Sequence, residues 1–116
     1  SGTPHAKSGR LRALGVTSAR RSPALPEIAT MMEAGVRGYE SSTWYGVLGP
    51  KALPRTIVTK INGEIVAILN IPEVRERLLN EGADPVGNTP EQFGEFIKSE
   101  IVKWGKVFKA AGIKPE

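Results

Sequence analysis

The sequence contains no cysteine, and this absence excludes several classes of protein together. Disulfide frameworks, cysteine-ligated zinc sites, iron–sulfur clusters and thiol nucleophiles all need a residue that is not there. Histidine is nearly as scarce, because the single one, His5, stands near the N-terminus without a partner for acid–base or metal chemistry. No glycine-rich phosphate loop is present either. The residues therefore predict no enzyme, no metal site and no bound cofactor.

Long apolar runs are also missing. No stretch of about 18 apolar residues is available to span a membrane. The N-terminal sequence, SGTPHAKSGRLRALGV, lacks the apolar core of a signal peptide. Two interpretations stay open at this point: the protein is cytosolic, or the sequence does not start at the protein's own beginning.

What the chain does have is the size and composition of one ordinary domain, with 116 residues, 40% of them apolar and 24% charged. A formal net charge of +4 suggests a nucleic-acid partner until the charges are located. Residues 1–37 carry six Lys or Arg against two Glu, and residues 38–116 carry ten charges of each sign. The basic segment holds no aromatic side chain that could stack on bases, so we expect no nucleic-acid partner.

Proline and glycine divide the first half of the chain into short predicted elements. Apolar alternation and β-favouring residues predict strands over 11–17 and 39–48, and 84–87 is expected to be an extended link or an edge strand. A helix is predicted over 26–34, opened by a proline and ended by a glycine. Strands separated by helices indicate a piece of an open α/β sheet.

Three helices are predicted in the second half, over residues 53–70, 72–82 and 89–112. The first and last of them carry their apolar residues on one face. Asn70 is expected to cap the middle helix, and Thr89 with Gln92 can form a capping box at the start of the last one. The fold class predicted is α/β, rich in helix with two or three strands. So few strands are thin cover for three amphipathic helices, and part of the sheet is expected to be missing.

One segment, YESSTWYG over residues 39–46, is the candidate for ligand binding. Its aromatic and hydroxyl side chains suit a cleft in which apolar walls carry a few oriented hydrogen-bonding groups. The alternative is that Trp44 and Tyr45 are simply core and strand-edge residues. The carboxylates occur instead as charges on helix faces, which is typical of solvated surfaces.

These motifs resemble a known family. The chain is similar to the C-terminal part of the Bug proteins, the periplasmic receptors of tripartite tricarboxylate transporters, in the order LRALGVTSARRSPALPEIATMMEAGVRGYESSTWYGVLGP and then PEVRERLLNEGADPVGNTPEQFGEFIKSEIVKWGKVFKAAGIKPE. The resemblance covers essentially all 116 residues. It departs from the family pattern modestly, at residues 28–32 and at Gly49.

The resemblance implies a partial type II periplasmic-binding-protein fold, of which this chain is the last third. Residues 1–37 would be an inter-lobe strand and crossing segment, and residues 38–116 the C-terminal part of the first lobe. The implied function is capture of a small carboxylate (a di- or tricarboxylate, an amino acid or an aromatic acid) for membrane transporter subunits. Ser42, Thr43 and Trp44 would come nearest the ligand cleft.

The same resemblance implies a periplasmic location and dependence on a missing N-terminal part of the receptor, or else self-association. Two hypotheses from other classes remain beside it. One is a small basic nucleic-acid-binding protein, and the other is a helical interaction module that uses the face of the last helix around Phe96, Trp104 and Phe108.

Overall fold

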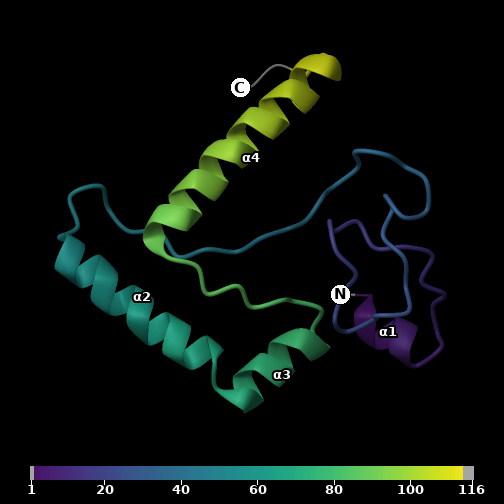
Figure 1. The fold of residues 1–116 in the computed structure, drawn as a ribbon, viewed down its shortest axis with the longest axis horizontal. Coiled ribbons are helices and arrows are strands. Elements are labelled where there is room, and N and C mark those ends of the chain that lie inside the picture. Colours follow the sequence, from purple (N-terminus) through teal and green to yellow (C-terminus); the bar gives the residue numbers. More distant parts are fainter. Residues whose placement is uncertain (1, 114–116) are drawn as a thin grey trace.

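The computed structural model describes residues 2–113 and contains four α-helices there. They are α1 (Thr3–Lys7), α2 (Arg55–Leu69), α3 (Pro72–Asn80) and α4 (Pro90–Ala110). In Figure 1, α2 and α3 follow one another along one edge, α4 rises away from them, and α1 lies beyond the end of α3. Lys7 Nζ donates a hydrogen bond of 3.3 Å to Asn80 Oδ1, which links α1 to α3.

The start of α4 is set by the capping box that the sequence predicts. The Gln92 backbone N–H donates to Thr89 Oγ1 at 3.2 Å, and the Thr89 backbone N–H donates to Gln92 Oε1 at 2.9 Å. Pro90 occupies the first turn, where no N–H is needed. After the last helical residue, Gly112 takes a φ of +69°, a left-handed conformation that favours glycine and stops the helix. The predicted helix over 89–112 is confirmed.

The two preceding helices also form close to their predicted bounds, but the predicted cap between them is wrong. Asn70 closes α2, and its side-chain amide donates to the Val66 carbonyl at 3.0 Å. The residue that precedes α3 is Ile71, which has no side-chain oxygen to accept a hydrogen bond. Pro72 at the first helical position fixes the entry into α3 instead.

The prediction of two or three strands is wrong for residues 2–113, where the structure contains no strand. The 11–17 stretch makes one isolated parallel bridge, between Val16 and Thr30, and the Ser41 N–H donates to the Thr17 carbonyl at 2.9 Å. The 39–48 stretch and 84–87 run without regular structure. A strand needs a continuous neighbour for its alternate N–H and C=O groups, and these stretches meet at single points only.

The predicted helix over 26–34 is also wrong, since these residues form turns around Thr30. The Thr30 N–H donates to Glu33 Oε2 at 2.8 Å, and the Glu33 N–H donates back to Thr30 Oγ1 at 3.1 Å. Met31 N–H donates to the Val16 carbonyl at 2.9 Å, so a backbone group that would continue a helix is bonded to a neighbouring segment. Thr30 is only 2% exposed, and its bridge to Val16 and its bonds with Glu33 hold these turns together.

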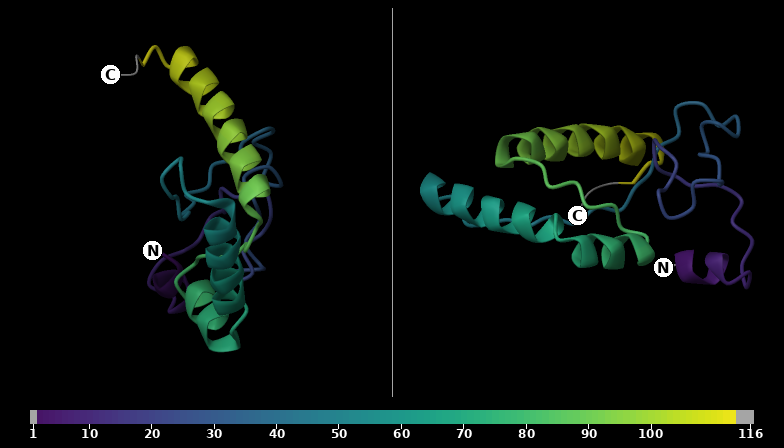
Figure 2. Two further views of the ribbon diagram at one scale, coloured as in Figure 1. Left: turned by 90° about the vertical axis from the view of Figure 1, so that its left-hand side faces the viewer. Right: turned by 60° about the horizontal axis from the view of Figure 1, so that its bottom comes forward.

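No apolar side chain is buried anywhere in residues 2–113. The accessible surface is 9454 Å², whereas a compact chain of this mass exposes about 6200 Å². The radius of gyration is 17.1 Å, against about 13 Å for a compact chain of this length. The molecule is an open slab with extents of 47 × 43 × 23 Å (Figure 2). The helices are therefore well formed locally but lack a layer to pack against, and the boundary at residue 37 stays a prediction.

Candidate functional site

The three candidate ligand-binding residues lie on an extended stretch, residues 39–50, that crosses the N-terminal half of α4 (Figure 1). Ser42 and Thr43 are exposed on it. Trp44 meets α4 edge-on, with ring centroids 5.6 Å from Phe93 and 5.4 Å from Phe96. Of the three, Trp44 is the one whose position is set by ring contacts from another element.

The backbone of the 39–50 segment touches α4 directly at Gly46. A β-carbon added at Gly46 would lie 2.1 Å from Cζ of Phe93, which is far inside van der Waals contact. Glycine is needed here because the aromatic ring occupies the space of a side chain. Trp44 and Gly46, two positions apart on an extended chain, therefore both face α4.

A carboxylate lies beside this contact, in the middle of the apolar face of α4. Glu100 is buried at 9% exposure, and it accepts hydrogen bonds from Lys103 Nζ at 2.9 Å and Trp104 Nε1 at 3.0 Å. The Lys103 and Trp104 hydrogen bonds, in that order, lower the pKa of Glu100, with a smaller contribution from the Trp44 side chain and with burial opposing them. The group is held as a carboxylate by its donors.

These side chains form the wall of an open hollow of about 500 Å³, which we call the α4 trough. It is lined by Trp44, Ile97, Glu100, Ile101, Trp104, Gly105 and Phe108. Ile101 is 67% exposed and Phe108 is 43% exposed. Apolar surface of this extent is typical of a face that another element covers.

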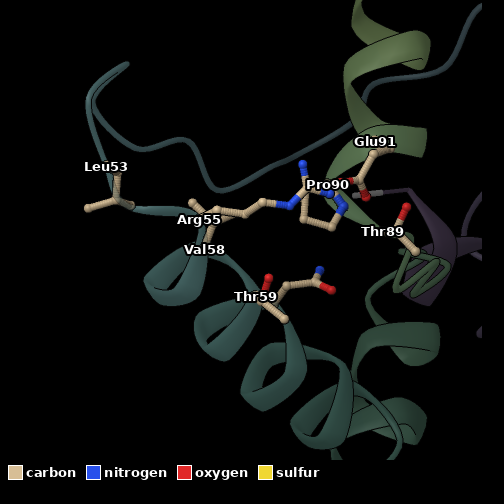
Figure 3. A pocket seen from close by; sticks show the side chains of 8 residues that line it. Leu53, Arg55, Val58, Thr59, Thr89, Pro90 and Glu91 are labelled. Atoms are coloured by element: carbon tan, nitrogen blue, oxygen red, sulfur yellow. Dashed lines mark hydrogen bonds and ion pairs between the residues drawn. The ribbon is translucent and has the colours of Figure 1, made fainter.

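A second hollow, of about 560 Å³, lies between the starts of α2 and α4 (Figure 3). The Arg55 guanidinium pairs with Glu91 across it, and the Asn62 side-chain amide donates to the Asn88 carbonyl at 3.0 Å. The Thr89 hydroxyl is engaged in the capping box of α4. These polar groups therefore bond one another and join the starts of the two helices.

Sequence reasoning missed Glu100. Phe96, Glu100 and Trp104 are spaced four residues apart, so they share one face of a helix. A charged residue within an apolar stripe of that spacing was the available signal.

No group of three His, Asp or Glu side chains in residues 2–113 could hold a metal ion. Within the same range, no helix combines the length and the hydropathy needed to cross a bilayer.

Comparison with known proteins decides the family. The model of the tripartite tricarboxylate transporter family receptor matches residues 1–113. The chain belongs to this receptor family. A UPF0065 protein from a tcbD–tcbE intergenic region of Pseudomonas sp. (strain P51) is 44% identical over 99 residues, which cover 84% of this chain and 30% of the relative. Protein BugT of Bordetella pertussis is 37% identical over 110 residues, covering 95% of this chain and 34% of BugT.

Solved structures of family proteins have the same arrangement. The R. palustris protein Rpa4515, solved with adipate, gives a TM-score of 0.82 at 38% identity, covering 99% of this chain and 38% of that one. The periplasmic binding protein BugD gives 0.83 at 34% identity, covering 100% and 40%. The chain thus spans about a third of the length of the Pseudomonas relative and of BugT. The resemblance to Bug proteins is confirmed.

Proposed function

We propose that this chain is part of a periplasmic receptor that captures small carboxylates for a tripartite tricarboxylate transporter. The observation that carries the proposal is the receptor-family match over residues 1–113. The adipate in the R. palustris neighbour supports a carboxylate as the ligand class. The receptor would hand its ligand to membrane subunits of the transporter, and it would bind without catalysing a reaction.

The proposed mechanism is closure of two lobes, in a type II periplasmic-binding-protein fold, around the ligand carboxylate. Hydroxyl groups donate hydrogen bonds to an ionised carboxylate, and such charge-assisted bonds are stronger than neutral ones. Ser42 and Thr43 are exposed and can supply two of these hydroxyls. Trp44 is 39% exposed, so part of its ring remains free to form an apolar wall beside them.

The open shape supports dependence on further receptor structure. The helices expose apolar stripes, and residues 2–113 hold no buried apolar side chain. The neighbour structures contain this arrangement inside chains more than twice as long. We propose that the missing part of such a receptor covers the α4 trough, and that self-association replaces it when this chain is alone.

The ligand proposal can be tested in a receptor-length chimera. This chain would replace the matching 38% of the R. palustris protein, and adipate binding would be measured by titration calorimetry. Citrate, glutamate, aspartate and nicotinate would be titrated in parallel to define the ligand class. We expect one of these carboxylates to bind. Removing a hydroxyl in Ser42→Ala or Thr43→Val should raise Kd about tenfold, the effect of one hydrogen bond to a charged group.

The matched control is Ser99→Ala, which removes an exposed hydroxyl that donates to the Phe96 carbonyl within α4. It should leave Kd unchanged. A chimera that folds, as judged by cooperative thermal unfolding, and binds none of the five carboxylates would contradict the proposed function. Unchanged affinity in both hydroxyl variants would remove Ser42 and Thr43 from the site while leaving the receptor assignment.

A helical interaction module remains a second candidate because the face it would use is open. Phe96 is 37% exposed and Phe108 is 43% exposed. The chimera separates the two ideas: a receptor part should bury this face against the rest of the chain, with the Trp104 emission shifting to shorter wavelength. An interaction module should leave it exposed in the folded monomer.

A further inference from the structure

We propose that Gly46, Phe93 and Glu100 are positioning residues: they hold the 39–50 segment on α4 through Trp44 and so set where Ser42 and Thr43 lie. This inference rests on the proposed function, because it concerns the placement of the hydroxyls that would meet the ligand. In this proposal α4 contributes to ligand recognition indirectly: it holds the 39–50 segment in place, and its own side chains do not touch the ligand.

The first support is the direction of the segment. Side chains alternate along an extended chain, so residues 42, 44 and 46 share one side and residue 43 faces the other. Trp44 and Gly46 both meet α4, the first through its ring and the second through its backbone. With these two points fixed, the neighbouring Thr43 is turned away from α4. The contact thus orients the segment as well as anchoring it.

The second support is how tightly Trp44 is held. Its ring meets Phe93 at an interplanar angle of 82° and Phe96 at 81°, both edge-on arrangements. The rings of Phe93 and Phe96 are themselves nearly parallel, at 17°, with centroids 6.4 Å apart. Edge-to-face aromatic pairs are favourable beyond the area they bury, and three rings that contact one another restrict each other's rotamers.

The third support is the carboxylate at the base of the α4 trough. Glu100 fixes the Trp104 indole through a hydrogen bond of 3.0 Å and lies in the same trough wall as Trp44. Its ion pair with Lys103 keeps the charge satisfied at a position that is almost fully covered. A satisfied buried carboxylate with directional donors specifies one packing arrangement, whereas an apolar residue would allow several.

Distance measurements between spin labels test this directly in the receptor-length chimera, where the apolar stripes of this chain are expected to be covered. This chain contributes no cysteine of its own, and any cysteine in the R. palustris part would be replaced. Labels would then be attached at Ser42→Cys and Ser99→Cys, both of which are exposed positions. We expect a narrow distance distribution in the parent chimera. Gly46→Ala forces the Phe93 ring away, and Glu100→Ala removes the acceptor of Trp104, so each should broaden the distribution about two-fold, as expected for release of a local segment.

Two control variants match these substitutions. Gly63→Ala makes the same change inside α2, where a β-carbon would meet nothing within 4 Å. Glu95→Ala removes the acid of another i,i+3 ion pair on α4, in which Lys98 Nζ lies 2.7 Å from Glu95 Oε1 on the solvent side. Neither control should broaden the distribution, and far-ultraviolet circular dichroism should show the same helix content in all four variants.

Three results would overturn the proposal: a broad distribution in the parent chimera, no broadening in Gly46→Ala and Glu100→Ala, or equal broadening in the controls. The measurement contains no ligand. Its failure would therefore remove the positioning role and leave the receptor function to the carboxylate titrations, and failure of those titrations would leave the positioning result intact.

Discussion

At the level of single residues, Glu100 shows how a charged group can belong to an apolar face. Its main donors, Lys103 and Trp104, are close along the helix, whereas Trp44, which lines the same hollow and also lowers the pKa of Glu100, is distant in sequence. The local donors could be foreseen from spacing on a helix. The part played by Trp44 could not, because nothing in a single sequence places residue 44 near residue 100.

Acid pH should loosen this contact. The folded chain holds the pKa of Glu100 below its usual value, so the carboxylate stabilises the fold above the unfolded pKa of about 4.3, and this contribution is lost as pH falls through the folded value. The near-ultraviolet circular dichroism of the tryptophans should weaken between neutral and acid pH. Glu100→Gln should start weaker and change less over the same range. An identical pH profile in the two proteins would contradict this expectation.

At the turn around Thr30, hydrogen-bond donors lower the pKa of a second carboxylate, that of Glu33. The Thr30 backbone N–H and then the Arg21 guanidinium lower the pKa of Glu33. Arg21 Nε lies 2.8 Å from Glu33 Oε2, in a pair whose side chains are each about half exposed. Exposed ion pairs contribute little to stability. The turn is therefore held mainly by two reciprocal hydrogen bonds, in which the backbone N–H of Thr30 and that of Glu33 each donate to a side-chain oxygen of the other residue.

At the level of elements, α2, α3 and α4 were predictable, whereas the short α1 and the extended segments were not. The signals for α4 all lie within a few residues of each helix end, as the Thr89–Gln92 box and Gly112 show. Strand formation over 11–17 and 39–48 depends on neighbours elsewhere, and residues 2–113 provide them only around Val16 and Thr17. The sequence correctly indicated extended backbone at Val16, but it could not provide the neighbouring strand that a β-ladder needs. The helix expected over 26–34 does not form because the Ala29 carbonyl accepts from the Val16 N–H and the Met31 N–H donates to the Val16 carbonyl.

The capping box makes a measurable prediction for α4. Thr89→Ala removes the oxygen that accepts from the Gln92 N–H, and loss of such a cap costs about 1 kcal/mol. We expect lower helix content and an earlier thermal transition by far-ultraviolet circular dichroism. Ser99→Ala, in the middle of the same helix, is the control and should be neutral or slightly stabilising, because alanine is the better helix former. Equal loss in both variants would show that the cap contributes nothing specific.

At the level of the whole molecule, surface area is the property that most separates this chain from an independent domain. Its accessible surface is 9454 Å², roughly half as much again as a compact chain of the same mass would expose. The shortage of strands in the sequence anticipated an incomplete layer, and the absence of a buried apolar side chain in residues 2–113 agrees with it. The proposed ligand-binding residues share this openness, since Ser42 and Thr43 are both exposed.

The isolated chain should therefore associate or remain loosely packed. We expect sedimentation velocity at increasing concentration to show species heavier than the 12.5 kDa monomer, because exposed apolar stripes favour contact between copies. A dye that fluoresces on apolar surfaces should bind strongly at low concentration and less in the receptor-length chimera. A monodisperse monomer that unfolds cooperatively and binds no dye would contradict this view.

Because α4 has its own signals for where it starts and ends, the helix is expected to form before the Trp44 contact during folding. A helix with its own cap and its own i,i+3 ion pairs can form within about a microsecond, long before residues half a chain away have found it. The Trp44 ring then docks on a surface that already exists, and its contacts are made late. Substitutions at Gly46 should accordingly speed unfolding and barely slow folding, because contacts that are absent from the folding transition state change mainly the unfolding barrier. The 39–50 segment would be the first part to detach on unfolding and the last to settle on folding.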